Sequence, residues 1–303
     1  MNKIKKPPLA LGGLSLSLFA LGNALGEYSQ TIHALLGGIA FIIYLVLLSA
    51  LIRHFKTYRK ELQHPISASI FPTVFMQGML LITYTVIFPT NSGIVLYNIS
   101  KGIWWLSFIS QFLYIILFSF QFLRNFKLNN VFPSWAVLYL GIGIVSLTSP
   151  STGYYNLGKI VFWYLLTATF ALLPIVFFRL YKLGIPKTVR ANIATLCAPS
   201  LLVVAYLNTF ENVNKLFLLF LIIIAQLLYF SVLYHLPNLI KDNFTPGFSA
   251  LTFPLVISAV ALKNSLVQLS PSSPLCFLFY FEMTLATLVV LKVFLDYLKY
   301  FRE

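Results

Sequence analysis

Long apolar stretches recur from one end of this 303-residue chain to the other, and they constrain the fold more than any other feature. Each is of the length, roughly 20 residues, that carries an α-helix across about 30 Å of hydrocarbon. Hydrophobic residues make up 59% of the chain and charged residues 9%, whereas soluble domains carry roughly 25% charged residues. The sequence therefore predicts an all-α membrane protein without a soluble domain.

Hydropathy and turn residues predict one transmembrane domain, residues 1–303, with ten helices arranged as five successive hairpins. The hairpins are expected at residues 8–53, 66–123, 131–180, 189–235 and 244–299. The start of the chain also has the outline of a secretory signal peptide, because lysines precede an apolar run, and this alternative stays open. Pro7 and Pro8 interrupt that junction, which favours a first membrane helix.

Lysine and arginine are distributed unevenly between the two sides of this topology. Seventeen of the 21 fall at the ends of the chain and in the connections from even to odd spans, and the other side has only Lys101, Lys159, Lys215 and Lys263. Cytoplasmic loops collect these residues, so both termini are predicted to be cytoplasmic in a plasma (inner) membrane. The net charge of +14 lies in short clusters rather than on a continuous basic face, which argues against nucleic-acid binding.

Prolines beside small or hydroxylated residues mark the odd-numbered spans. They stand 64, 61, 66 and 55 residues apart, at Pro8, Pro72, Pro133, Pro199 and Pro254. A proline inside a helix frees a backbone carbonyl, which is costly in lipid unless protein, water or a hydroxyl satisfies it. The odd helices are therefore expected inside, where they would line a central pore in a quasi-fivefold arrangement. A solid bundle with kinked helices is the alternative.

Three short motifs resemble the tellurite-resistance/C4-dicarboxylate transporter family, which includes TehA-type bacterial proteins, fungal malate permeases and slow-type anion channels of plant guard cells. The motifs are Pro8–Gly13, Ala198–Ser200 and Thr252–Pro254, on the first, seventh and ninth spans. The resemblance implies five hairpins with quasi-fivefold symmetry, usually in a homotrimer with one pore per protomer. It also implies anion conduction through a mainly apolar pore, which a phenylalanine of the ninth helix occludes.

The resemblance assigns this occluding role to Phe253 and a pore-lining position to Gly13. An ordinary packing role is the alternative for Phe253, since the chain has 29 phenylalanines. Further pore-lining candidates stand at and beside the prolines of the odd spans: Phe71, Thr73, Phe132, Ser134, Pro199, Ser200, Thr252 and Pro254. Core packing is the favoured interpretation for Phe71 and Phe132.

Charged residues are scarce in the spans. Glu282 is the one carboxylate deep in an apolar stretch, and such acids are candidates for proton coupling. It falls on the tenth, outer helix, where a structural acid at a protomer interface is favoured. The odd spans, with the ninth ending near residue 263, carry no charged residue between their ends. No metal or cofactor is expected, because the histidines and cysteines lack ligand spacing.

Two functions fit these features. The first is a gated channel for small monovalent anions such as chloride or nitrate. The second is a secondary transporter, with or without proton coupling, for C4-dicarboxylates or oxyanions such as tellurite and sulfite. An inner basic residue that would bind a carboxylate is not expected, which favours the channel. An enzyme finds no support, because no catalytic cluster appears.

Overall fold

The computed structural model describes residues 6–86, 91–241, 243–269 and 273–302, and these form helices without a strand. Eight of the described helical segments are long and apolar enough to cross a membrane. The even-numbered spans are the long, unbroken ones: α2 (Gln30–Arg53), α6 (Asn91–Phe122), α10 (Tyr155–Leu183), α12 (Lys215–Ile240) and α14 (Ser273–Arg302). The chain is thus an all-helical, multi-pass membrane protein.

The odd-numbered spans are shorter or broken. The first is α1 (Leu11–Leu25), and the third is α4 (Pro65–Ile70), α5 (Thr73–Leu80) and η1 (Leu81–Tyr84). The fifth is α7 (Trp135–Gly141), α8 (Ile144–Leu147) and α9 (Ser149–Thr152). The seventh is η3 (Lys187–Cys197) and α11 (Ser200–Thr209), and the ninth is η4 (Pro246–Leu251) and α13 (Thr252–Leu269). The connections contain α3 (Phe55–Glu61) and η2 (Leu128–Asn130).

Ten spans are predicted, but only eight described segments are long enough to cross a membrane. The short first helix and the broken fifth span account for the difference. The first helix has 15 residues, and the fifth span is divided into three short helices. Breaks in the third and seventh spans fall at Pro72 and Pro199, because proline has no N–H for the helical ladder.

Odd and even segments differ sharply in burial. In the most apolar stretch of each even helix, 22–39% of residues are buried, against 61–78% in the third, seventh and ninth spans. Most residues of α1 are buried as well. The even helices instead expose bulky apolar side chains such as Leu106, Phe120 and Ile160, which suits contact with lipid. The prolines therefore lie in the segments that protein surrounds.

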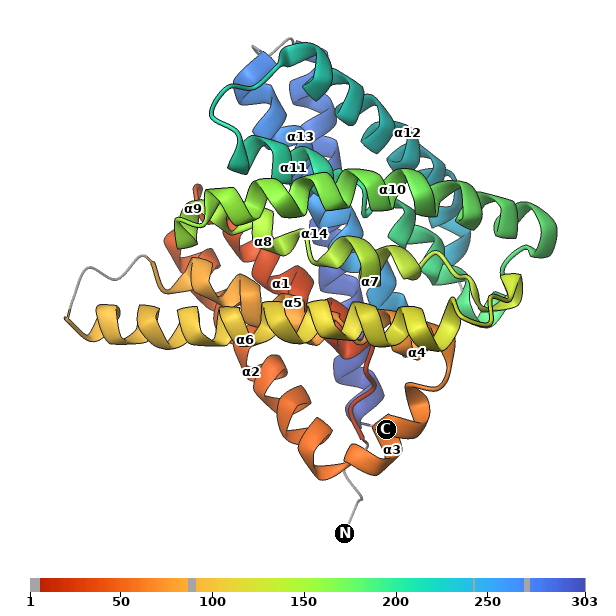
Figure 1. The fold of residues 1–303 in the computed structure, drawn as a ribbon. Coiled ribbons are helices and arrows are strands. Elements are labelled where there is room, and N and C mark those ends of the chain that lie inside the picture. The colour runs from red at the N-terminus through yellow and green to blue at the C-terminus, as the bar shows by residue number, and fades with distance from the viewer. Residues whose placement is uncertain (1–5, 87–90, 242, 270–272, 303) are drawn as a thin grey trace.

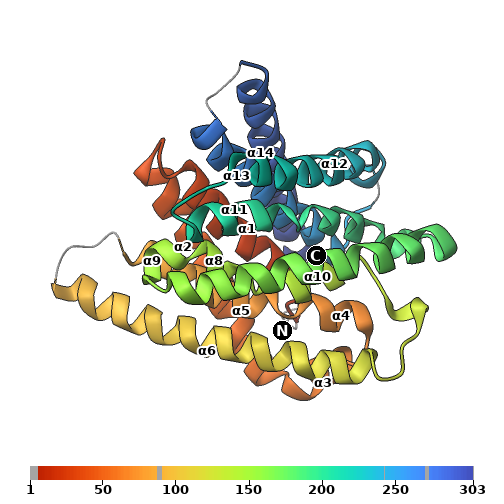
Figure 2. The same cartoon turned by 45° about the horizontal axis from the view of Figure 1, so that its top comes forward.

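The buried segments contact one another in a closed circle. Helix α1 packs on α5, α5 on α7 and α8, α8 on α11, α11 on α13, and α13 again on α1. The long helices pack outside this circle, as α6 does on α5 and α14 on α13 and α1. Figures 1 and 2 both show α6 and α10 covering one face of the molecule.

Close approach of α5 to the outer layer requires Gly78. A Cβ there would lie 2.2 Å from Ser107 Oγ and 2.9 Å from Tyr44 Oη. Gly78→Ala is expected to destabilise the protein by about 1–3 kcal/mol, as overpacking does, and to lower the unfolding temperature in detergent. The matched control is Gly102→Ala on exposed α6, where nothing lies within 4 Å. Equal effects of the two variants would contradict this packing.

Candidate functional site

An inner cavity of about 90 Å³ lies in the N-terminal halves of the buried segments. All five odd spans contribute to its wall, and no long outer helix does. None of its lining residues is charged: they are Ala10, Gly13, Leu16, Ile66, Ile70, Thr73, Val137, Thr188, Val189, Ala191, Asn192, Thr195, Gly247, Ser249, Ala250, Phe253 and Pro254. The cavity is a mainly apolar chamber with a few hydroxyl and amide groups.

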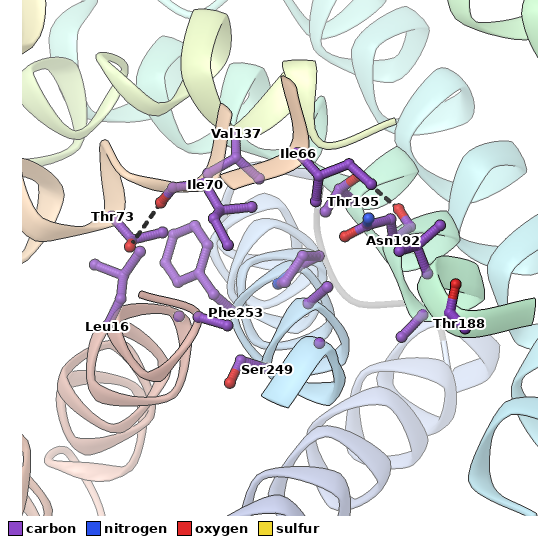
Figure 3. Close-up of a pocket in the computed structure, with 17 residues that line it drawn as sticks. Leu16, Ile66, Ile70, Thr73, Val137, Thr188, Asn192, Thr195, Ser249 and Phe253 are labelled. Carbon is purple, nitrogen blue, oxygen red and sulfur yellow. Dashed lines mark hydrogen bonds between the residues drawn. The ribbon is translucent and has the colours of Figure 1, made fainter. Parts of the chain in front are cut away.

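Phe253 lies in the wall of this cavity, with 8% of its surface exposed. Figure 3 shows its ring projecting from α13 toward Ile70 and Thr73. Its position is determined locally, because it follows Thr252 at the junction of η4 and α13. The Thr252 hydroxyl lies 2.7 Å from the carbonyl oxygen of Ser249 and 3.2 Å from that of Gly13. These contacts hold the start of α13 against α1.

Gly13 lines the same cavity from α1. A Cβ at this position would lie 3.2 Å from the Ser249 carbonyl oxygen and 3.3 Å from the Ser249 Cβ. The glycine therefore leaves the wall open and lets η4 approach α1 closely.

The other candidates beside the prolines occupy two kinds of position. Thr73 and Pro254 line the inner cavity. Pro199 and Ser200 are buried at the junction of η3 and α11, outside that wall. Ser134 is buried too, and its hydroxyl shares a 2.8 Å hydrogen bond with that of Ser69. This bond joins the fifth span to the third.

Phe71 and Phe132 do not lie in the cavity wall. The ring of Phe71 packs edge-on against Tyr114 of the outer helix α6, with 5.1 Å between ring centroids. The ring of Phe132 lies 4.4 Å from the guanidinium carbon of Arg179 on α10. Both rings thus connect an inner segment to the outer layer.

An outer cavity of about 180 Å³ lies at the opposite, C-terminal ends of the same segments. Again all five odd spans contribute and no long outer helix does. Its lining residues are Ala20, Asn23, Ala24, Glu27, Leu80, Leu147, Val204, Asn208, Ile257, Val260, Lys263 and Asn264. The two cavities therefore share one set of walls.

Helix α13 relates the two cavities directly. Of its residues, Phe253 lines the inner cavity, and Ile257, Val260 and Asn264 line the outer one. Steps of three or four residues keep to one face of a helix with 3.6 residues per turn. The cavities thus lie along one face of α13, and one helical turn separates Phe253 from Ile257.

The ninth span corrects one expectation. Helix α13 continues to Leu269, so Lys263 lies inside the helix and lines the outer cavity. The expectation that odd spans carry no internal charge is therefore wrong for this helix, and the expected lack of an inner basic residue no longer favours the channel over the transporter. The polar pair Lys263 and Asn264 lowers the local hydropathy, although the backbone remains helical.

Glu282 is fully buried within the chain. Ser258 of α13 donates a 2.9 Å hydrogen bond to its Oε2, and Gln226 of α12 is a second hydrogen-bonding neighbour of the carboxyl group. The carboxylate thus faces the inner helix α13, which differs from the expected place at a protomer interface. Hydropathy put Glu282 on an outer helix correctly, but it did not show which side of that helix faces inward.

Several cavity residues have no distinctive sequence signal. Asn192 and Thr195 of η3 and Ser249 of η4 line the inner cavity, but no motif singles them out. The feature that these residues share in the sequence is their spacing. Polar residues recur every three or four positions before the proline of an inner span.

Comparison with known proteins adds one finding to this geometry. A protein-family model described as SLAC1, voltage-dependent anion channel, matches residues 7–298. The match takes in every segment that lines the two cavities. No curated protein matches the chain.

Proposed function

We propose that this chain, which belongs to the SLAC1 voltage-dependent anion channel family and not to a family of enzymes, is a gated channel for small monovalent anions such as chloride and nitrate. One observation carries the proposal: two cavities on one face of α13 are walled by all five inner segments. The pore runs through both, at the centre of a quasi-fivefold arrangement of the five hairpins 8–53, 66–123, 131–180, 189–235 and 244–299.

In this proposal Phe253 closes the pore between the cavities. Its ring lines the inner cavity, and the next residue on the same face, Ile257, lines the outer one. Narrow apolar constrictions lose water and so stop ions. Displacement of the ring opens the channel, with Gly13, Thr73 and Pro254 as neighbouring wall residues.

The inner cavity is expected to bind anions weakly, which suits conduction better than tight binding of one ion. Its wall has no charged side chain, so an anion meets only hydroxyl and amide dipoles and leaves easily. Anions that shed water readily are therefore expected to pass best.

Glu282 supports a second candidate, a proton-coupled transporter of C4-dicarboxylates or oxyanions. Its carboxylate is hydrogen-bonded to Ser258, the neighbour of Ile257 in the outer cavity wall. A change of its protonation would therefore act on the inner helix beside the closed point of the pore. Intramembrane acids commonly serve in proton relays.

Reversal potentials distinguish the two candidates. For the channel, we expect the reversal potential to follow an imposed chloride or nitrate gradient and to ignore a pH gradient, in wild type and in Glu282→Gln alike. Malate should carry little current. A pH-dependent shift that Glu282→Gln removes would contradict the channel and establish the transporter.

The proposal also includes cytoplasmic termini and a homotrimer with one pore in each protomer. The distribution of 17 of 21 Lys and Arg residues supports the orientation. It makes the inner cavity the cytoplasmic one, because this cavity lies at the basic end of the odd segments.

A further inference from the structure

Lys263 provides a positive charge in the wall of the outer cavity. Its side chain is 15% exposed, and its ammonium group lies 2.8 Å from Glu27 Oε2 and donates to the Ala24 carbonyl oxygen at 3.2 Å. From α13, its side chain reaches the end of the neighbouring helix α1 along the cavity wall. An ammonium group at this place meets any anion that enters from this side.

Three asparagines surround the same space. Asn23 donates one amide bond to Thr83 Oγ1 at 2.8 Å, and Asn208 donates one to the Leu147 carbonyl oxygen at 2.7 Å. Each amide nitrogen carries two N–H donors, so one remains on each. The side-chain amide of Asn264 has no hydrogen-bond partner among the described residues, which leaves both of its N–H donors.

Glu27 is the present partner of Lys263, and it is held loosely. Its side chain is 72% exposed, so water and salt screen the pair, and such pairs are weak. The neighbouring Tyr28 brings no competing negative charge, because burial and then the charges of Tyr280 and Glu27 raise the pKa of its phenol. Lys263 is thus largely covered in the cavity wall, whereas the Glu27 side chain is mostly exposed.

We propose that the outer cavity is an anion-binding subsite, in which Lys263 supplies the charge and Asn208 and Asn264 supply amide donors, and that Glu27 competes with the anion for Lys263. The proposal rests on the channel function and adds a second place of binding to the pore. An arriving chloride or nitrate ion replaces the Glu27 carboxylate beside the ammonium group. Glu27 thereby sets how tightly the subsite holds an anion.

Opposite effects of two substitutions test this proposal, because Lys263→Met and Glu27→Gln break the same ion pair. The measurement is the unfolding temperature of the purified full-length protein in detergent, titrated with sodium chloride against sodium gluconate at constant ionic strength. Wild type should be stabilised by chloride. Lys263→Met should weaken the apparent affinity at least several-fold, and Glu27→Gln should strengthen it several-fold. Lys263→Arg should retain it, and Lys215→Met, on exposed α12, should match wild type.

Equal effects of Lys263→Met and Glu27→Gln, or an absence of chloride stabilisation in wild type, would overturn the subsite and leave a purely structural ion pair. Currents separate this result from the channel proposal. If Lys263→Met carries the same anion current as wild type, the channel proposal stands and the subsite proposal is contradicted. If chloride binding depends on Lys263 but the protein passes no anion current, the subsite proposal stands and the channel proposal is contradicted.

Discussion

Phe253→Ala is expected to raise the anion current several-fold in planar bilayers or oocytes. The ring forms part of the wall of the inner cavity, and the next residue on that face of α13, Ile257, lines the outer cavity. Truncation to a methyl group removes the bulky apolar obstacle and lets water join the two cavities. An apolar barrier to an ion falls steeply once water can enter.

Phe71→Ala is the matched control for this experiment. Phe71 also directly precedes a proline, but its ring packs outward against Tyr114 of α6. The same substitution there should not raise the current. Phe-to-Ala changes in packed cores cost roughly 3–5 kcal/mol, so both variants need a monodisperse elution profile before recording. An unchanged current in well-folded Phe253→Ala would contradict the gate.

Gly13→Leu, combined with Phe253→Ala, is expected to reduce the raised current by roughly tenfold or more. The new side chain projects from α1 into a cavity of about 90 Å³ and fills the space that the first substitution opened. Its Cβ lies 3.2 Å from the Ser249 carbonyl oxygen, so η4 must shift by a few tenths of an ångström. Gly13→Ala requires the same shift but fills less space, and it should reduce the current less.

Gly38→Leu is the control for the block. Gly38 is exposed on the outer helix α2, and nothing lies within 4 Å of a Cβ at this position. Combined with Phe253→Ala, it should leave the raised current unchanged. If the double variant with Gly13→Leu conducted as well as Phe253→Ala alone, the pore would not pass along this face of α1.

The division into inner and outer helices is where sequence reasoning was most informative. Proline and small residues predicted that the odd spans lie inside, and the burial of those spans agrees. The proline pattern alone did not separate cavity residues from packing residues, and only the family resemblance singled out Phe253 from Phe71. Phe253 and Phe71 share the Phe-Pro context, but one ring lies in the cavity wall and the other packs on α6. A dipeptide does not encode the rotation of its helix about the helix axis.

For the charged residues too, the sequence places a residue in a span but does not show which neighbours it contacts. Sequence alone places Glu282 deep in an apolar span, but the neighbour that its carboxylate binds, Ser258, comes from packing between α13 and α14. Hydropathy ends the ninth span at Lys263, because it averages over polar residues. The helix continues to Leu269, since an amphiphilic wall around a cavity can hold an ammonium group that a lipid-facing helix cannot.

The sequence by itself determined that this protein is all-helical and membrane-spanning, and which of its helices protein surrounds. These properties follow from transfer of side chains and backbone groups between water, lipid and protein, and each segment has its own transfer free energy. Only the tertiary structure decided that two cavities share five walls, that Lys263 lies in one of them, and that Phe71 lies in neither. Those properties depend on how each helix is rotated against its neighbours, which is set by packing between residues far apart in the chain.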